Sequence, residues 1–162
     1  MTTQNKIVGF KTLRKKISPL RQHGKTIAFT NGCFDILHFG HISYLEKAKG
    51  KDRVLIVGLN SDASVRRIKG PRRPIVPQRE RARLLAALTC VDFVTIFNED
   101  TPLKVIKSLK PDILIKGSDW KGKDVVGSSV VKSYGGRIEF VRYLPKFSST
   151  NIIETVVKRC AA

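Results

Sequence analysis

Two of the three histidines in this chain, His38 and His41, lie three residues apart with Gly40 between them. They follow a short apolar segment that ends near Gly32, and they open a segment with helical periodicity. A helix N-terminus binds phosphate through free backbone N–H groups, and glycine lets a ligand approach the backbone closely. Two imidazoles at this spacing point the same way. They can donate hydrogen bonds to phosphate oxygens and stabilise the charge that develops as a phosphoanhydride breaks.

Zinc is the alternative ligand for such a histidine pair. A zinc site needs a third ligand, and the remaining histidine, His23, lies in an unrelated segment. The cysteines Cys33, Cys90 and Cys160 are odd in number and far apart, without the spacing of zinc ligands or of a disulfide framework. We expect reduced thiols and no zinc. A catalytic role for Cys33 stays open, because this residue lies beside the histidine segment.

Apolar segments alternate with longer helical segments along the chain, and these elements must position the histidines. The predicted strands are residues 26–30, 53–58, 93–97, 112–115 and 138–141. The predicted helices are residues 11–22, 40–49, 79–88, 102–109, 125–134 and 149–158, with Pro19 interrupting or ending the first and Asp62 capping a further short one. We expect one doubly wound, Rossmann-like α/β domain with a parallel sheet over residues 1–162, with 1–25 as a helical N-terminal extension. Ligands of such sheets bind after the carboxyl ends of the strands.

The net charge of +18 is the unusual feature of the composition. A basic excess of this size favours a polyanionic partner such as nucleic acid. The lysines and arginines are spread along the chain, however, and aromatic residues make up only 7% of it, too few for a stacking platform for single strands. We therefore expect a basic surface that concentrates charge at a site for small anions, and no specific nucleic-acid partner.

The sequence carries no recognisable targeting or membrane segment. No apolar run approaches the roughly 18 residues that span a bilayer. The N-terminal residues are polar and lack the apolar core of a signal peptide. We therefore expect a cytoplasmic protein without a membrane partner.

From about Thr26 to Val157 the chain resembles the nucleotidyltransferase superfamily of cytidylyltransferases and adenylyltransferases. The resemblance rests on residues 30–32, on 32–35 followed by 38–41, and on 60–67, 69–71, 116–119 and 148–150. Within the superfamily the chain is most similar to the branch that transfers AMP from ATP to D-glycero-beta-D-manno-heptose 1-phosphate. This resemblance implies formation of ADP-heptose and pyrophosphate, with Mg²⁺ as cofactor, for synthesis of the lipopolysaccharide core. It also implies a homodimer, since relatives of this kind are often dimers.

The resemblance implies three catalytic residues. His38 and His41 would contact the ATP phosphates and stabilise the transition state. Lys69 would reach the phosphates from a mobile loop. Asp35 would help to bind the reacting phosphates, directly or through Mg²⁺.

The nucleotide and the acceptor have further implied contacts. Asp119 would recognise the nucleoside with Trp120 beside the base, and the hydroxyls of Ser148, Ser149 and Thr150 would hold the β- and γ-phosphates. The other implied nucleotide contacts are Thr30, Asn31, Gly32, Cys33, Phe34, Gly40, Lys116 and Gly117. The implied contacts of the sugar phosphate are Asn60, Asp62 and Arg81.

Structural explanations stay open for several of these residues. Lys69 and its basic neighbours are compatible with a solvated charged loop, and Arg81 with an exposed position on a helix. Asp119 can cap a turn, and Trp120 can pack. The segment 148–150 can act only as an N-cap.

The sequence departs from the family pattern in places. Lys146 stands where a glycine often precedes the Ser-Thr-Thr segment, Ser149 replaces the first threonine, and the turn after Lys49 looks one residue short. The sugar-kinase half of the bifunctional members is missing, so we expect a stand-alone transferase.

Two other functions remain as alternatives. A cytidylyltransferase for glycerol 3-phosphate or a related alcohol phosphate would also carry the pair Asp119 and Trp120, but residues 145–147 lack the Arg-Thr-x-Gly run of that branch. A nucleic-acid-binding protein on a degenerate transferase fold would explain the +18 charge. Both motif histidines are present, however, which argues against lost catalysis.

Overall fold

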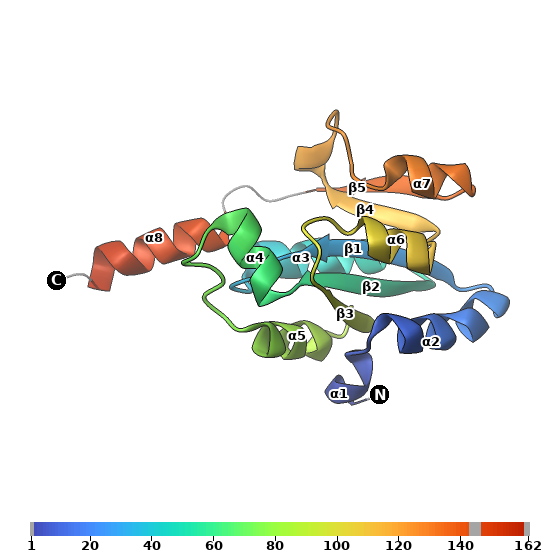
Figure 1. Cartoon of the computed structure of the whole chain (residues 1–162), viewed down its shortest axis with the longest axis horizontal. Coiled ribbons are helices and arrows are strands. Elements are labelled where there is room, and N and C mark those ends of the chain that lie inside the picture. Colours follow the sequence, from blue (N-terminus) through green and yellow to red (C-terminus); the bar gives the residue numbers. More distant parts are fainter. Residues whose placement is uncertain (1, 143–146, 161–162) are drawn as a thin grey trace.

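Five strands form one parallel sheet in the order β3-β2-β1-β4-β5 (Figure 1). They are β1 (Thr26–Gly32), β2 (Arg53–Asn60), β3 (Phe93–Phe97), β4 (Ile113–Gly117) and β5 (Arg137–Val141). This computed structural model describes residues 2–142 and 147–160. The strand order reverses between β1 and β4, which is the switch point where doubly wound sheets bind their ligands.

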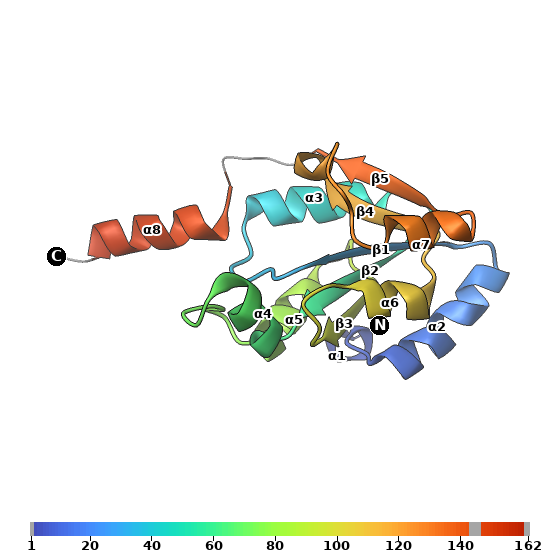
Figure 2. The ribbon, with the colours of Figure 1, turned by 45° about the horizontal axis from the view of Figure 1, so that its top comes forward.

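Helices cover both faces of the sheet. The helices of the described residues are α1 (Thr3–Lys6), α2 (Phe10–Gln22), α3 (Phe39–Lys49), α4 (Asp62–Lys69), α5 (Gln78–Ala87), α6 (Leu103–Leu109), α7 (Ser128–Ser133) and α8 (Ser149–Cys160), with a 3-10 turn at Ser118–Trp120. Leu45 of α3 and Leu85 of α5 belong to the core on one face. Leu13 of α2, Ile106 of α6 and Val131 of α7 belong to the core on the other. Figure 2 shows α3 on one side of the sheet and α2 with α6 on the opposite side.

The register of the ladders brings the ends of the central strands to one edge. β1 pairs with β2 as far as Gly32 opposite Leu59, and β2 pairs with β3 as far as Asn60 opposite Phe97. On the other side of β1, Gly117 closes the ladder between β4 and β5. The polar and glycine residues that end these strands are therefore neighbours, although they are far apart in the sequence.

The doubly wound parallel sheet predicted from the sequence is confirmed. β1, β2 and β4 each continue two residues beyond their predicted ends. The prediction stopped at polar and glycine residues, but the backbone ladder continues through Asn31 and Gly58, which are paired with each other. The helix predicted for 125–134 is shorter, since Gly127 has a φ of 88° and precedes the first turn of α7.

Two local predictions need correction. α2 continues through Pro19 to the end of its predicted range, so the proline neither interrupts nor ends it. Ser61 caps α4 in place of Asp62, because its Oγ accepts a hydrogen bond from the Ser64 N–H at 3.1 Å. The Asp62 carboxylate instead lies 2.7 Å from Arg81 Nη2.

The N-terminal segment packs into the domain rather than extending from it. The Val8 N–H donates to the Val94 carbonyl at 2.9 Å, and Ile7 forms a bridge to the same strand. Leu13 is fully buried and Ile17 is 2% exposed. The described part of residues 1–25 carries α1 and α2, and the buried side chains of α2 belong to the core.

The last helix has a different environment. α8 has no buried residue, and it points away from the sheet in both views (Figures 1 and 2). Lys146, which precedes it, lies outside the described residues. Among the described helices, none combines the length and the apolar character that crossing a membrane requires.

The packing of α2 gives a stability prediction. We expect Leu13→Ala to lower the free energy of unfolding by about 2–5 kcal/mol, because it removes a fully buried side chain and leaves a cavity. The matched control is Leu84→Ala on α5, where the side chain is 48% exposed and the loss should be about 1 kcal/mol or less. Urea titrations followed by circular dichroism measure both. Equal midpoints for the two variants would contradict the packing of α2 on the sheet.

Candidate active site

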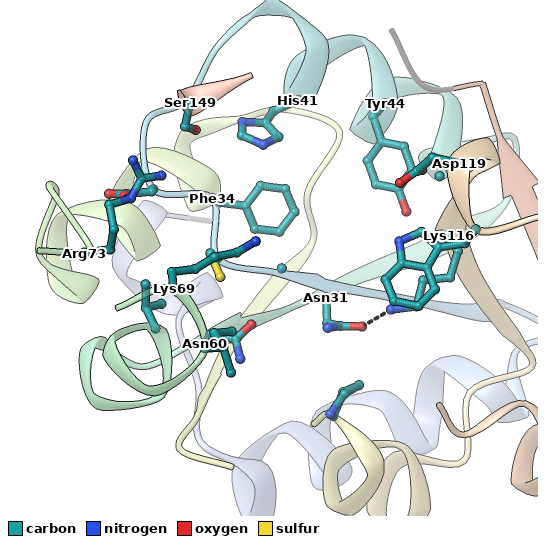
Figure 3. Close-up of a pocket in the computed structure, with 18 of the residues that line it drawn as sticks. Asn31, Phe34, His41, Tyr44, Asn60, Lys69, Arg73, Lys116, Asp119 and Ser149 are labelled. Atoms are coloured by element: carbon teal, nitrogen blue, oxygen red, sulfur yellow. Dashed lines mark hydrogen bonds and ion pairs between the residues drawn. The ribbon is translucent and has the colours of Figure 1, made fainter. Parts of the chain in front are cut away.

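A cavity of about 760 Å³ opens at the carboxyl ends of β1, β2 and β4, beside the N-termini of α3 and α8. Figure 3 shows His41 from α3, Lys69 from α4, Asn60 from β2 and Lys116 from β4 around it. The cavity therefore lies at the switch point of the sheet, where the sequence predicted the ligand site.

Most of the predicted site residues line this cavity. They are Asn31, Gly32, Cys33, Phe34, Asp35, Gly40, His41, Asn60, Lys69, Lys116, Gly117, Asp119, Trp120, Ser149 and Thr150. The predicted residues outside the lining are Thr30, His38, Asp62, Arg81 and Ser148. These residues contact neighbouring protein groups: Thr30 contacts Tyr44, His38 stacks on His41, Arg81 pairs with Asp62, and Ser148 caps α8.

The two histidines form a stacked pair at the start of α3. Their ring centroids are 3.8 Å apart with an interplanar angle of 22°, and the His41 ring tilts against Phe34 at 5.0 Å. A Cβ at Gly40 would lie 2.9 Å from Phe147 Cβ and 3.1 Å from the His38 ring. Glycine is therefore required between the histidines because the C-terminal segment approaches the backbone closely there.

Burial makes both imidazoles poor bases in the free protein. It lowers the pKa of His41 to about 4, with a smaller contribution from the neighbouring His38, and it lowers the pKa of His38 as well. Both rings are therefore neutral at pH 7, and each offers one N–H donor. His41 lines the cavity, and the His38 ring stacks on the His41 ring.

Arg81 lies beneath the cavity rather than in it. Its side chain is fully buried, although an exposed helix position or a contact with the substrate phosphate had been predicted. Its guanidinium donates to the carbonyls of Cys33, Asn60 (3.0 Å) and Val76 (2.9 Å) and to the Asp62 carboxylate (2.7 Å). These four acceptors occupy the guanidinium, so Arg81 and Asp62 hold together the segments that form the site.

Asp35 has a similar internal role. Its side chain is 3% exposed, and its Oδ1 accepts hydrogen bonds from the Ile75 N–H at 2.7 Å and the Val76 N–H at 3.0 Å. Its Oδ2 lies 2.8 Å from Arg73 Nε. The carboxylate therefore anchors the basic loop after α4 through two backbone hydrogen bonds and one ion pair.

The donor set of the cavity does not fit a metal held by the protein. No cluster of three metal-ligating side chains occurs among residues 2–142 and 147–160. Asp35, the residue proposed to act through Mg²⁺, would have to release Ile75, Val76 and Arg73 to take a cation. Its predicted contact with Mg²⁺ is therefore not supported by the arrangement of the loop.

Lys116 joins the two strands at the switch point. Its Nζ donates to Asn31 Oδ1 at 2.7 Å and lies 5.2 Å from the centre of the Trp120 ring, a cation–π distance. Burial lowers the pKa of Lys116 to about 8, and the nearby Asp119 opposes this shift. The ammonium is still mostly protonated at pH 7, so it places a fixed positive charge between β1 and β4.

The N-terminus of α8 supplies the opposite wall. Ser148 is its N-cap, since its Oγ accepts from the Asn151 N–H at 3.0 Å. Ser149 Oγ donates to the Ile36 carbonyl at 3.1 Å, which ties α8 to the loop before α3. Ser149 and Thr150 reach the cavity, and the free N–H groups of this turn are suited to phosphate.

Several residues of the cavity were not predicted. They are Tyr44, Val65, Ile68, Arg73, Asp100, Thr101, Pro102 and Val126. Tyr44 could be found only from the fold, because its hydroxyl lies 2.8 Å from Thr30 Oγ1 across the gap between α3 and β1. Asp100 and Thr101 follow β3 directly, so the rule that ligands bind after strand ends could have found them.

A comparison with known proteins agrees with this geometry. The family model described as cytidylyltransferase-like matches residues 29–155. The bifunctional protein HldE of Syntrophotalea carbinolica is 53% identical over 148 residues, which is 91% of this chain and 30% of that protein. HldE of Geobacter metallireducens is 56% identical over 138 residues, 85% of this chain and 28% of that protein. The chain thus spans about 30% of the length of these curated relatives.

A solved structure shows the same fold. The lipopolysaccharide core biosynthesis protein from Thermoplasma volcanium superposes with a TM-score of 0.60 at 30% identity, covering 74% of this chain and 96% of that one. The family match includes both histidines, Lys69, and the segments after β1, β2 and β4 that form the cavity. From the sequence match and the shared architecture together, the chain belongs to the cytidylyltransferase-like family.

Proposed function

We propose that the chain transfers AMP from ATP to D-glycero-beta-D-manno-heptose 1-phosphate and releases pyrophosphate. The observation that carries this proposal is the cavity in which His41, Lys69 and the N-termini of α3 and α8 converge. The identity with HldE proteins and with a lipopolysaccharide core biosynthesis protein supports heptose as the sugar.

The proposed reaction is an in-line displacement at the α-phosphorus of ATP. An oxygen of the acceptor phosphate forms the new P–O bond, and the bond from the α-phosphorus to the bridging oxygen breaks. The electron pair leaves with pyrophosphate, and no covalent bond to the protein is needed. The protein contributes by positioning two anions and by stabilising the charge that collects on the leaving group.

His41 is the donor best placed for that charge. Its ring is neutral in the free protein, and a bound triphosphate brings negative charge that raises its pKa again. The hydrogen bond to the bridging oxygen strengthens as the bond breaks, whereas Lys69 and the N–H groups of α8 also bind the ground state. Mg²⁺ would arrive bound to the phosphates of ATP, since the described side chains do not form a site for it.

We also propose that the protein is a cytoplasmic homodimer, a proposal that rests on the family resemblance. A cytoplasmic location matches the need for ATP and a phosphorylated sugar as substrates. Sedimentation equilibrium measures the mass in solution.

The first functional prediction concerns the nucleotide and the acceptor. We expect pyrophosphate release with ATP and heptose 1-phosphate to exceed release with CTP and glycerol 3-phosphate. The reason is the similarity of residues 60–71 to the heptose branch and the high identity with HldE. The assay uses each NTP with a panel of sugar and alcohol phosphates. Turnover of CTP with glycerol 3-phosphate, without turnover of ATP with heptose 1-phosphate, would contradict the proposed function.

The second prediction concerns the histidine pair. We expect His38→Ala and His41→Ala each to lower kcat by about 10²–10³, with a smaller change in KM for ATP, because the lost donor acts mainly on the transition state. His23→Ala is the matched control, since His23 lies at the exposed end of α2 and should leave kcat unchanged. Steady-state kinetics with circular dichroism as the folding check measures this. A folded variant that keeps more than about a tenth of wild-type kcat would show that its histidine is not this donor.

The third prediction is a pH dependence of stability. Burial lowers the pKa of His41 from 6.5 to about 4. Between pH 6.5 and about pH 4 the unfolded chain therefore binds more protons than the folded chain does. The free energy of unfolding consequently falls as the pH falls through this range. We expect His41→Asn, which cannot titrate, to lose less stability between pH 7 and pH 4.5 than the wild type does, by up to about 2 kcal/mol. Urea titrations at both pH values, with His23→Asn as control, measure the difference. If the free energy of unfolding falls by the same amount in all three proteins, His41 is not held neutral by burial.

A further inference from the structure

The cavity continues past the phosphate-binding groups toward the end of β3. There its wall consists of Val65 and Ile68 from α4 and of Asp100, Thr101 and Pro102 from the loop between β3 and α6. None of these residues has a role in the proposed reaction so far. Together these residues offer a carboxylate, a hydroxyl group and apolar carbon atoms to a ligand in this part of the cavity.

The strand order places this wall opposite the groups proposed for the nucleotide. Lys116 lies near the end of β4 and Trp120 follows that strand, whereas Asp100 and Thr101 follow β3, at the other side of β1 and β2. Neighbouring strands lie about 4.8 Å apart, so the ends of β3 and β4 are separated by about 14 Å. Figure 3 draws Lys69 and Lys116 on opposite sides of the cavity. A ligand on the β3 side therefore lies across the phosphates from the base.

Hydrogen bonds hold the loop that carries this wall against α4. Ser61 Oγ lies 2.6 Å from Asn98 Oδ1, and Ser64 Oγ donates to the Glu99 carbonyl at 2.9 Å. Asn60, which lines the cavity, donates from Nδ2 to Ser64 Oγ at 2.9 Å. The wall is thus joined to the end of β2.

Arg67 fixes the carboxylate of Asp100. Its Nε donates to Asp100 Oδ1 at 2.7 Å, and its Nη2 donates to the Asn98 carbonyl. Within the described residues, Asp100 Oδ2 makes no hydrogen bond or ion pair, and the Asp100 side chain is 54% exposed. The guanidinium offsets the negative charge of Asp100, so a phosphorylated acceptor is repelled less.

We propose that Asp100 and Thr101 bind the hydroxyl groups of a polyhydroxylated acceptor. A carboxylate oxygen accepts hydrogen bonds from sugar hydroxyls, and the threonine hydroxyl can accept or donate one. Val65, Ile68 and Pro102 offer the apolar surface on which the C–H groups of a sugar ring pack. This inference rests on the proposed function, which gives the position of the phosphates. Asp100 and Thr101 are then the residues that select the acceptor.

The test compares acceptor and nucleotide kinetics in two variants. We expect Asp100→Ala to raise KM for heptose 1-phosphate about 10- to 100-fold and Thr101→Val to raise it up to about tenfold, with KM for ATP changed less than about twofold, because only acceptor hydrogen bonds are lost. Glu99→Ala is the matched control, since this carboxylate pairs with Lys104 at 2.9 Å and does not line the cavity. Methyl phosphate as acceptor should show no difference between wild type and the two variants.

The outcomes separate this inference from the proposed function. If both variants raise KM for ATP and leave KM for the acceptor unchanged, the wall binds the nucleotide and the inference is wrong. Unchanged KM values for both substrates would overturn it too. If another polyhydroxylated phosphate replaces heptose 1-phosphate and still depends on Asp100, the hydroxyl site stands and the heptose assignment fails. A wild-type protein that turns over no polyhydroxylated acceptor would overturn both.

Discussion

The guanidinium of Arg81 is fully buried beneath the cavity, and the shape of the site depends on how its charge is satisfied. A buried cation is costly unless it is paired and hydrogen-bonded. Here the acceptors come from the turn after β1, from the end of β2, from the start of α4 and from the loop before α5. Satisfying one charge therefore fixes four segments that are remote in the sequence.

The Asp35 carboxylate continues this arrangement toward the substrate. It holds the backbone of Ile75 and Val76, and Val76 also accepts from Arg81. The ion pair with Arg73 then fixes a cation at the cavity wall. Asp35 and Arg81 thus form a buried layer beneath the groups proposed to bind the phosphates.

The sequence predicts well what depends on local patterns. The alternation of apolar and helical segments was enough to predict the parallel sheet. The spacing of glycine and histidine was enough to predict that His41 and Gly40 lie at the cavity. Arg81 shows where such patterns fail, because Arg79 and Arg83 on the same helix are exposed, and only tertiary contacts distinguish the buried member. Tyr44 and Arg73 were missed for the same reason, since each depends on a partner from another element.

The same strand order that creates the cavity bears on the proposed reaction, in which two anionic substrates would share the cavity. In-line displacement requires the attacking and leaving oxygens to lie on opposite sides of the α-phosphorus. Groups on two sides of the same cavity must therefore contact the phosphates. The turns of α3 and α8 lie on one side, with free N–H groups suited to a leaving pyrophosphate. Lys69 at the end of α4 and Arg73 in the loop after it lie on another side, next to the wall after β3. Because both substrates are negatively charged, they repel each other at contact distance, and cations on several sides of the cavity offset that repulsion. A large positive net charge is then of use at the proposed site itself.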